Sequence, residues 1–353
     1  MKIANISHND LDGYTSSLVL DVFNNNHYNG AHELSIFNVA IQDVIPTITK
    51  IDADTNLIIL TDISPTVEII NTLTDFNIPY FIIDHHENSD EVLSKIKDFY
   101  IADFSLISSK VVTTEGSASE ILFNMTCDRS VFSYDDLETL VTAVSIYDTW
   151  EFSAVSSSFK DTIIGLNILF YEYGKKYFYD IFRNYLSWNN NKYVDLSDKF
   201  PISPSKIIAT LNSIFNRYLD IDLNYILSHP YVQNDNDKFL KEKNKLYENL
   251  TEENIRVDNF GNKYIIKESF AYCNRLADSL RDTVFYNGKK YSSADIDYIV
   301  FVDIHDTYTQ YGLRSVNPDV DVSEIARSKG GNGHKAAAGF RIQHESILDA
   351  ELW

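Results

Sequence analysis

Acidic residues and histidines follow three short apolar runs in the first quarter of the sequence. The runs and the polar clusters after them are Ile3–Ile6 with His8–Asp12, Leu57–Leu60 with Asp62, and Tyr80–Ile83 with Asp84–His86. Carboxylates mixed with imidazoles suit Mn²⁺, with Mg²⁺, Co²⁺ or Zn²⁺ less favoured. No cysteine belongs to these clusters, which argues against a closed structural zinc site. The residue types therefore indicate a candidate metal site.

The apolar runs also predict the fold that would bring the clusters together. Short, continuously apolar segments bounded by polar turns are typical of strands buried on both faces of a parallel sheet. Predicted helices alternate with these strands, as in βαβ units. Ligands of open parallel sheets bind outside the carboxyl ends of the strands, where all three clusters fall. The expected elements are strands 3–6, 33–37, 57–60 and 80–83 and helices 14–23, 44–50, 67–76, 117–124 and 134–150, the last with Ser133 as its N-cap.

Asp148, near the end of the last of these helices, would complete a group with Asp10, Asp12, Asp62 and His85. Carboxylates crowded into a small volume raise one another's pKa unless cations compensate their charge. Two divalent ions roughly 3.5–4 Å apart that share a bridging carboxylate are the usual arrangement for phosphoester hydrolysis. Asp10 and Asp12, two positions apart in extended chain, could each address a different ion. Taken singly, Asp62 is also typical of a turn or an N-cap, and Asp148 of a polar helix end.

Composition limits the class of partner. The chain has 353 residues, with 30 Lys and Arg against 51 Asp and Glu, a formal net charge of −21. Such acidity disfavours a general basic surface for long nucleic acid but allows a short substrate held at one site. Cys127 and Cys273 lie in apolar contexts and are interpreted as buried hydrophobic side chains in a reducing compartment. Without an amino-terminal signal or a membrane-length apolar run, we expect a cytoplasmic protein.

The rest of the chain divides into two further parts. From Phe159 to Asn254 the pattern is helical and rich in aromatic residues. Aromatic rings can stack on exposed bases, but helical spacing without interleaved basic residues favours core packing. Beyond Asn254 we expect a hairpin turning at 259–262, a helix 273–281, strands 296–302 and 310–315, and a helix 322–329. The predicted division is 1–186 with the candidate metal residues, a helical connector over 187–254, and an α+β part over 255–353.

Glycines and basic residues gather near the carboxyl end of the sequence. The glycines of Gly330–Gly333 follow a predicted helix, where glycine commonly ends a helix in the left-handed conformation. His334, Lys335 and the small residues 336–338 come next, and exposed amides beside basic side chains can cradle a phosphate. Arg314 would add a fork of donors suited to phosphate oxygens. The residues alone are compatible with two interpretations of this segment: the end of a helix, or a clamp for a phosphate.

Taken in order, these motifs resemble those of the DHH phosphoesterases, a family named for the triplet found here at Asp84–His86. The metal-binding motifs of that family have counterparts at His8–Gly13, Thr61–Asp62, Asp84–His86 and Asp148. The first is similar to that of bacterial nano-RNases of the longer type, also called oligoribonuclease B. The DHH-associated substrate domain is matched at Leu313–Ser315, Val320–Ala326 and Gly330–Phe340. The resemblance implies a parallel-sheet catalytic domain, a helical connector and a smaller α+β substrate-binding domain, with a cleft between the two domains.

The resemblance also implies ligands for two metal ions. Asp10 and Asp62 would hold the first ion. Asp12, Asp62, His85 and Asp148 would hold the second, with Asp62 bridging the two. His8 is either a further ligand of the first ion or a hydrogen-bonding neighbour.

Further roles follow from the same resemblance. His86 would face the scissile phosphate as an electrostatic partner or proton donor. Asp84 would orient an imidazole. The implied substrate contacts are Arg314, Ser315, Gly331, Gly333, His334 and Lys335.

The activity expected from this resemblance is that of a metal-dependent phosphodiesterase, an exonuclease that releases mononucleotides from short single-stranded oligonucleotides. Hydrolysis would use two metal ions and a bridging hydroxide. One alternative is a phosphodiesterase for a linear or cyclic dinucleotide (pApA, cyclic di-AMP) or a bisphosphonucleotide phosphatase. Another is a non-catalytic nucleotide-binding sensor on a degenerate scaffold. The acidity disfavours a processive exonuclease of the RecJ type and a long duplex partner. We expect no membrane partner, and a homodimer is allowed.

Overall fold

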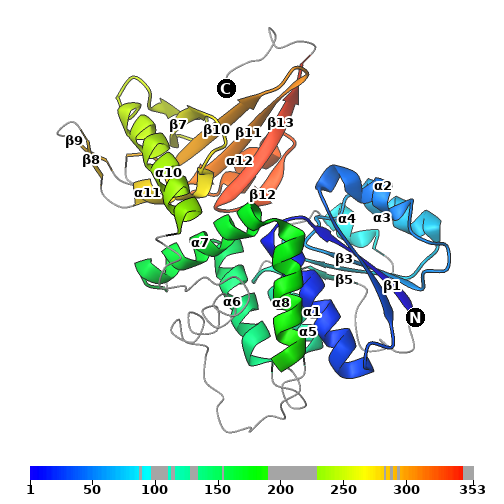
Figure 1. Cartoon of the computed structure of the whole chain (residues 1–353). Coiled ribbons are helices and arrows are strands. Elements are labelled where there is room, and N and C mark those ends of the chain that lie inside the picture. Colours follow the sequence, from blue (N-terminus) through cyan, green and yellow to red (C-terminus); the bar gives the residue numbers. More distant parts are fainter. Residues whose placement is uncertain are drawn as a thin grey trace. The chain divides into compact units, whose positions relative to one another are not determined.

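A computed structural model of the chain (Figure 1) describes residues 1–86, 90–96, 110–112, 116–127, 134–152, 155–189, 229–281, 284–286, 289–291 and 295–344. The chain forms two compact units, an amino-terminal unit over Met1–Gln233 and a carboxyl-terminal unit over Asn234–Trp353. The predicted three-part division stays a prediction, because much of the expected connector lies outside the described residues.

A parallel sheet forms the centre of the amino-terminal unit, as predicted. Its strands have the order β2-β1-β3-β4-β5, and every neighbouring pair is parallel. The strands are β1 (Lys2–His8), β2 (Glu33–Val39), β3 (Leu57–Thr61), β4 (Tyr80–Asp84) and β5 (Lys110–Val112). Strand β5 was not predicted from the sequence. The order reverses between β1 and β3, because β2 lies on one side of β1 and β3 lies on the other.

Helices cover both faces of this sheet (Figure 1). One face packs on α1 (Leu11–Tyr28), α5 (Ala118–Thr126), α6 (Asp135–Asp148), α7 (Ser157–Tyr173) and α8 (Lys175–Asn189), and the other on α2 (Val44–Ile48), α3 (Val67–Phe76) and α4 (Asp90–Ser94). Successive strand residues point to opposite faces. Ile59 accordingly packs on the α1 side, and Ile58 and Leu60 on the α3 side. Burial on both faces explains the continuous apolar runs of the sequence.

Three helix starts differ from the predictions, and that of α5 differs by one residue, because Ser117 caps the helix and Ala118 begins it. Helix α1 begins at Leu11 rather than at residue 14, because the side chain of Asp10 accepts a hydrogen bond from the backbone N of Gly13 and caps the helix. A short 3₁₀ turn, η1 (Ile41–Asp43), precedes α2. Helix α6 begins at Asp135 with Tyr134 in the N-cap position. Its predicted N-cap, Ser133, lies outside the described residues.

The aromatic run of α7 and α8 divides into buried and exposed members. Phe170, Phe178 and Phe182 are buried in the core, which confirms the core-packing interpretation for them. Tyr171 and Tyr177 are each 50% exposed, so core packing is wrong for these two. The helical spacing puts only part of such a run on the inner face of a helix.

A mixed sheet forms the carboxyl-terminal unit, with the order β12-β13-β11-β10-β7-β6. Its strands are β6 (Arg256–Val257), β7 (Lys263–Glu268), β10 (Tyr298–Ile304), β11 (Tyr308–Ser315), β12 (Asn332–His334) and β13 (Ala337–Gln343), with a separate hairpin of β8 (Val284–Tyr286) and β9 (Lys289–Tyr291). Helices α11 (Cys273–Arg281) and α12 (Val322–Ser328) pack on it, and α10 (Pro230–Glu248) belongs mostly to this unit. The hairpin at 259–262 is confirmed. Strands β12 and β13 were missed, because alanine and glycine have low strand propensity.

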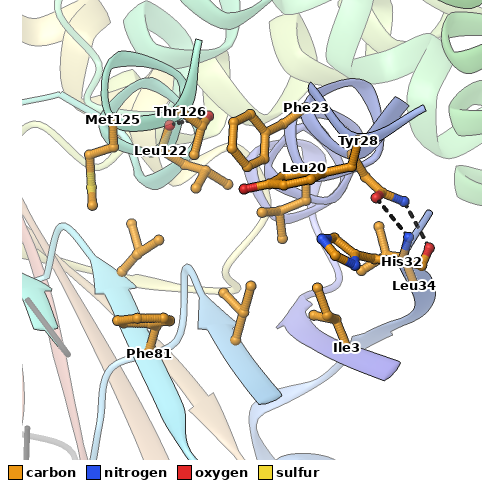
Figure 2. Close-up of a pocket in the computed structure, with 13 residues that line it drawn as sticks. Ile3, Leu20, Phe23, Tyr28, His32, Leu34, Phe81, Leu122, Met125 and Thr126 are labelled. Atoms are coloured by element: carbon orange, nitrogen blue, oxygen red, sulfur yellow. Dashed lines mark hydrogen bonds between the residues drawn. The ribbon is translucent and has the colours of Figure 1, made fainter. Parts of the chain in front are cut away.

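An apolar cavity of about 40 Å³ lies inside the amino-terminal unit (Figure 2). Leu20 and Phe23 of α1 and Leu122 of α5 line it from one side, and Phe81 and Ile3 of the sheet from the other. Apolar cavities of this size commonly stay dry. The cavity includes none of the candidate metal residues, so it belongs to the core and not to the site.

Cys127 and Cys273 are both buried with free thiols, as predicted, and burial raises the pKa of Cys273 to about 11. None of the helices that the structure describes is long and apolar enough to cross a membrane.

Candidate metal centre

The strand order explains where the acidic clusters meet. Strands β1 and β3 are neighbours at the point where the order reverses, which is where α/β folds bind their ligands. His8 is the last residue of β1, and Asp10 follows it in the loop before α1. Asp62 follows the last residue of β3. Residues that are distant in sequence therefore leave the sheet at one edge.

Asp10 joins the start of α1 to His8. Its Oδ1 accepts a hydrogen bond from the backbone N of Gly13 (3.0 Å), and its Oδ2 lies 2.6 Å from Nδ1 of His8. Burial acts to raise the pKa of Asp10, but the contacts with His8 and Gly13 outweigh it and lower the pKa to about 2. Nδ1 of His8 also lies 3.8 Å from Oδ2 of Asp62. Ligand atoms of His8, Asp10 and Asp62 all lie within 4.8 Å of one another, and we call these residues the first ligand group.

A buried polar network underlies the first ligand group. Ser7 Oγ donates to the carbonyl oxygen of Gly13 (2.9 Å), Thr61 Oγ1 donates to Ser7 Oγ (2.8 Å), and Asn5 Nδ2 donates to Thr61 Oγ1 (3.1 Å). These bonds tie the ends of β1 and β3 to α1. Gly13 is required here, because a Cβ atom would lie 2.0 Å from the carbonyl oxygen of His8.

Asp62 connects the first ligand group to His85. Its backbone is left-handed (φ 56°), a conformation that Asn and Asp tolerate better than most residues. The residue is 3% exposed, and its Oδ1 lies 3.4 Å from Nε2 of His85. Burial, followed by the charges of Asp10, Asp12 and Asp148, raises its pKa well above the ordinary value.

Asp12 is held against the amino-terminal end of α5. Its carboxylate accepts hydrogen bonds from the backbone N atoms of Ala118 (3.0 Å) and Ser119 (3.3 Å) and from Ser119 Oγ (2.5 Å). Burial raises the pKa of Asp12 to about 6, against the lowering effect of the Ser119 hydrogen bond, and the charge of Asp10 adds to the rise. Helix α5 therefore fixes the direction of this carboxylate.

Asp12, His85 and Asp148 form a second ligand group, whose ligand atoms also lie within 4.8 Å of one another. Nε2 of His85 lies 3.1 Å from Oδ2 of Asp148, in contact but without hydrogen-bond geometry. Asp148 is the last residue of α6, where the helix dipole disfavours a carboxylate. Burial, followed by the charges of Asp12, Asp10 and Asp84, raises its pKa well above the ordinary value. A helix-end role alone does not account for an acidic residue there.

His86 is paired with Asp84 beside these groups. Nδ1 of His86 lies 2.7 Å from Oδ1 of Asp84, which is fully buried at the end of β4. Burial acts to lower the pKa of His86, but the contact with Asp84 and the nearby charges raise it above the ordinary value. The imidazole that Asp84 orients in this way is that of His86.

The donor set fits divalent cations. Oδ2 of Asp62 and Oδ2 of Asp148 are buried and accept no hydrogen bond from the residues that the structure describes. Burial of such acceptors without a partner is costly, and the raised pKa values report the same crowding of charge. Divalent cations would relieve both costs. Carboxylate oxygens mixed with imidazole nitrogens suit Mn²⁺, with Mg²⁺, Co²⁺ and Zn²⁺ also compatible.

Within the carboxyl-terminal unit, two of the three basic residues predicted to bind substrate share one row of the sheet. Arg314 of β11 and His334 of β12 both pair with Ala337 of β13. Nε of Arg314 donates to Oδ1 of Asn274 on α11, and its Nη1 donates to the carbonyl oxygen of Leu313 (2.8 Å). Asn274 and the backbone thereby hold the guanidinium in one orientation.

The glycines of this unit have structural reasons for their positions. Gly330 is left-handed (φ 79°) and ends α12, as the helix-end interpretation predicted. A Cβ atom at Gly331 would lie 2.1 Å from the carbonyl oxygen of Gly339, and one at Gly333 would lie 2.4 Å from Cα of Ala338. Close packing on β13 therefore accounts for both. Their role in cradling a phosphate stays a prediction.

The two remaining predicted substrate contacts differ in exposure. Ser315 is buried, and its Oγ donates to the carbonyl oxygen of Asn317 (2.5 Å). Lys335 is exposed, and its carbonyl oxygen accepts from the backbone N of Val322. The substrate roles of Ser315 and Lys335 stay predictions.

Sequence interpretation missed the residues that position the site. Ser119 holds Asp12, and Asn274 holds Arg314. A serine near a helix start signals a cap, but the sequence does not show which carboxylate that helix end faces. Asn274 carries no signal of its own, because its partner lies on another element.

A scan against protein-family models finds no match, and a search of curated protein sequences finds none. Among solved structures, an uncharacterised protein from Helicobacter pylori is 18% identical with a TM-score of 0.38, covering 97% of this chain and 93% of its own. A pGpG-specific phosphodiesterase, PggH from Vibrio cholerae, is 13% identical with a TM-score of 0.40, covering 98% and 94%. RecJ from Thermus thermophilus, in complex with Mn²⁺, is 13% identical with a TM-score of 0.49, covering 96% of this chain and 49% of RecJ.

Proposed function

We propose that this chain is a metal-dependent phosphoesterase of the DHH type. One observation carries the proposal: Asp62 of the first ligand group lies 3.4 Å from His85 of the second, and its buried Oδ2 accepts no hydrogen bond from the described residues. A carboxylate between two mixed Asp and His groups is the arrangement that a two-ion hydrolytic centre requires. Crowding of this kind without cations would be destabilising, so a structural role alone is a poor explanation for it.

Each residue of the proposed centre would have a specific role. His8, Asp10 and Asp62 would hold one ion, and Asp12, Asp62, His85 and Asp148 a second. Divalent ions, when bound, would lower the pKa of water and offset charge on the phosphate oxygens. His86, oriented by Asp84, would supply a positive charge or a proton toward the leaving oxygen.

For the substrate, we propose a short single-stranded oligonucleotide from which mononucleotides are released. The net charge of −21 disfavours long nucleic acid, and a short chain needs few cationic contacts. Arg314 and His334 offer two of them in one row of the carboxyl-terminal sheet. Linear and cyclic dinucleotides carry the same groups and form the second candidate class. A cytoplasmic location and a homodimer stay predictions.

The decisive experiment compares the natural chain with Asp62→Asn. Asparagine tolerates the left-handed backbone of this position, so the change removes charge with little strain. With Mn²⁺, we expect turnover of labelled pApA and short RNA to fall at least about 100-fold in Asp62→Asn. Parallel assays on short DNA and cyclic di-AMP would rank the substrates.

The matched control is Asp75→Asn, which changes an exposed carboxylate on α3 and should leave turnover unchanged. Retained Mn²⁺-dependent turnover in Asp62→Asn would refute the proposed centre. So would the absence of Mn²⁺-dependent hydrolysis of every phosphoester by the natural chain.

A further inference from the structure

The turn between α7 and α8 brings an aromatic ring and a lysine to the edge of the first ligand group. Tyr171 lies in the last turn of α7, and Lys175 is the first residue of α8. Nζ of Lys175 donates a hydrogen bond to the carbonyl oxygen of Asn9, the residue between His8 and Asp10. Lys175 is therefore adjacent to two candidate ligands, although it is distant from them in sequence.

Tyr171 is half exposed beside this lysine. Tyr171 is 50% exposed, and the centroid of its ring lies 4.9 Å from Nζ of Lys175. Burial, followed by the charges of Asp10 and Asp148, raises the pKa of Tyr171 to about 12. Its hydroxyl is thus within electrostatic range of both ligand groups.

Core packing anchors the turn and supports the ring of Tyr171 from one side, where its centroid lies 5.1 Å from that of Phe170, but it does not account for the exposed half of Tyr171 or for Lys175. Phe170, next to Tyr171, is fully buried, and its ring makes edge contacts with Tyr14 (centroids 5.4 Å apart) and Phe178 (5.5 Å). These contacts fix the turn on α1. The exposed half of Tyr171 is consequently held in place by a packed turn.

The chemistry of the pair suits a nucleotide. The aspartates of the centre repel a phosphate, and a cation at their edge offsets that repulsion. An ammonium group has three donors, of which Asn9 accepts one. An aromatic ring can stack on any nucleobase. A phosphodiester without a base would gain no binding energy from this ring.

We propose that Tyr171 and Lys175 bind the substrate: the ring of Tyr171 stacks on a nucleobase, and the ammonium group of Lys175 contacts a phosphate of the same short oligonucleotide. This inference rests on the proposed function and adds a specificity to it. The centre would prefer phosphodiesters that carry a base beside the scissile phosphate over those that do not.

The test uses the full chain with Lys175→Met, Lys175→Arg, Tyr171→Ala and Tyr171→Phe. On pApA with Mn²⁺, we expect Lys175→Met and Tyr171→Ala each to raise KM about 10-fold with kcat within about twofold. Lys175→Arg and Tyr171→Phe keep the charge and the ring, so they should stay within about threefold of the natural KM. An abasic analogue of the dinucleotide should show almost no effect of Tyr171→Ala.

The chain offers matched controls on α8, close to both positions of interest. Lys176 has an 82% exposed side chain and pairs with Asp180, and Tyr177 is as exposed as Tyr171. Neither Lys176→Met nor Tyr177→Ala should change KM. Binding is measured independently of turnover, by fluorescence anisotropy of a labelled phosphorothioate dinucleotide without metal, and should weaken in Lys175→Met and Tyr171→Ala.

A structural role for Lys175 predicts a different result. If it acted only by holding the loop at Asn9, Lys175→Met would weaken Mn²⁺ binding measured by electron paramagnetic resonance, and Lys175→Arg would not restore the natural KM. That result, or an equal rise in KM in Lys175→Met and Lys176→Met, would overturn the inference. Unchanged KM in the variants of a chain that hydrolyses pApA overturns this inference alone, whereas a natural chain without hydrolysis overturns the proposed function.

Discussion

Single carboxylates in the centre differ in their acidity because each has a different set of neighbours. Asp10 has a pKa of about 2 because His8 and Gly13 stabilise its charged form. Asp12 has a pKa of about 6, and those of Asp62 and Asp148 are raised well above the ordinary value. The metal-free centre is therefore a proton-binding site, and cations must displace these protons when they bind.

This linkage predicts how metal binding depends on pH. A carboxylate with a raised folded-state pKa contributes stability that is present below its unfolded pKa and is lost as pH rises through the folded pKa. The metal-free protein should therefore lose stability between about pH 5 and pH 7.5, as these buried carboxylates become charged. Bound Mn²⁺ compensates their negative charge in the same range. We expect the rise in Tm caused by Mn²⁺ to be larger at about pH 7.5 than at about pH 5.5.

Differential scanning fluorimetry measures the shift, and calorimetry in two buffers of different ionisation enthalpy should show proton release on Mn²⁺ binding. Asp62→Asn serves as the control, because it removes one of the raised groups and should reduce both signals. An equal Tm shift at the two pH values would contradict the assignment of these carboxylates as ligands.

At the scale of elements, the position of α5 determines where Asp12 points. Ser119 Oγ and two backbone N atoms at the start of α5 bind the Asp12 carboxylate, so the helix is part of the centre although it supplies no ligand. Interactions that orient ligands in this way typically change metal affinity about 10- to 100-fold when they are removed.

We therefore expect Ser119→Ala to weaken one of two Mn²⁺ binding events about 10-fold and to leave the other unchanged. Thr126→Val is the matched control on the same helix, since the Thr126 hydroxyl bonds to the carbonyl oxygen of Leu122 and not to Asp12. Isothermal titration with Mn²⁺ measures both events. Identical titrations for the two variants would show that α5 does not position a ligand.

At the scale of the whole molecule, net charge predicts a preference for short substrates. At a formal charge of −21, each added nucleotide beyond the reach of the few cationic contacts brings repulsion and no compensating contact. We expect kcat/KM to be highest for chains of about two to four nucleotides and to fall at least about 10-fold for a chain of about 20 nucleotides at low ionic strength. Added salt should narrow the difference, because it screens repulsion.

Steady-state rates on a ladder of single-stranded lengths test this expectation. Asp75→Asn, which removes one exposed charge, should leave the length profile unchanged. A long chain hydrolysed as efficiently as a dinucleotide would contradict the expectation and would favour a processive exonuclease.

The sequence alone determined the parallel sheet and the edge at which the acidic clusters lie. Burial on both faces requires continuous apolar runs such as Leu57–Leu60, and such runs are visible without a structure. Helices α3 and α11 were predicted to the residue, since local periodicity and capping signals set their ends. The ordered motifs around Asp10, Asp62 and Asp84–His86 likewise identified the candidate ligands.

Tertiary structure alone decided how those residues are combined. The burial of Asp12 against α5 and the left-handed backbone of Asp62 each depend on how the chain is folded around them. No local pattern encodes such arrangements, because the same side chain can cap a helix, face solvent or bind an ion. For the same reason, only the packing of α7 on the core distinguishes the exposed ring of Tyr171 from its buried aromatic neighbours.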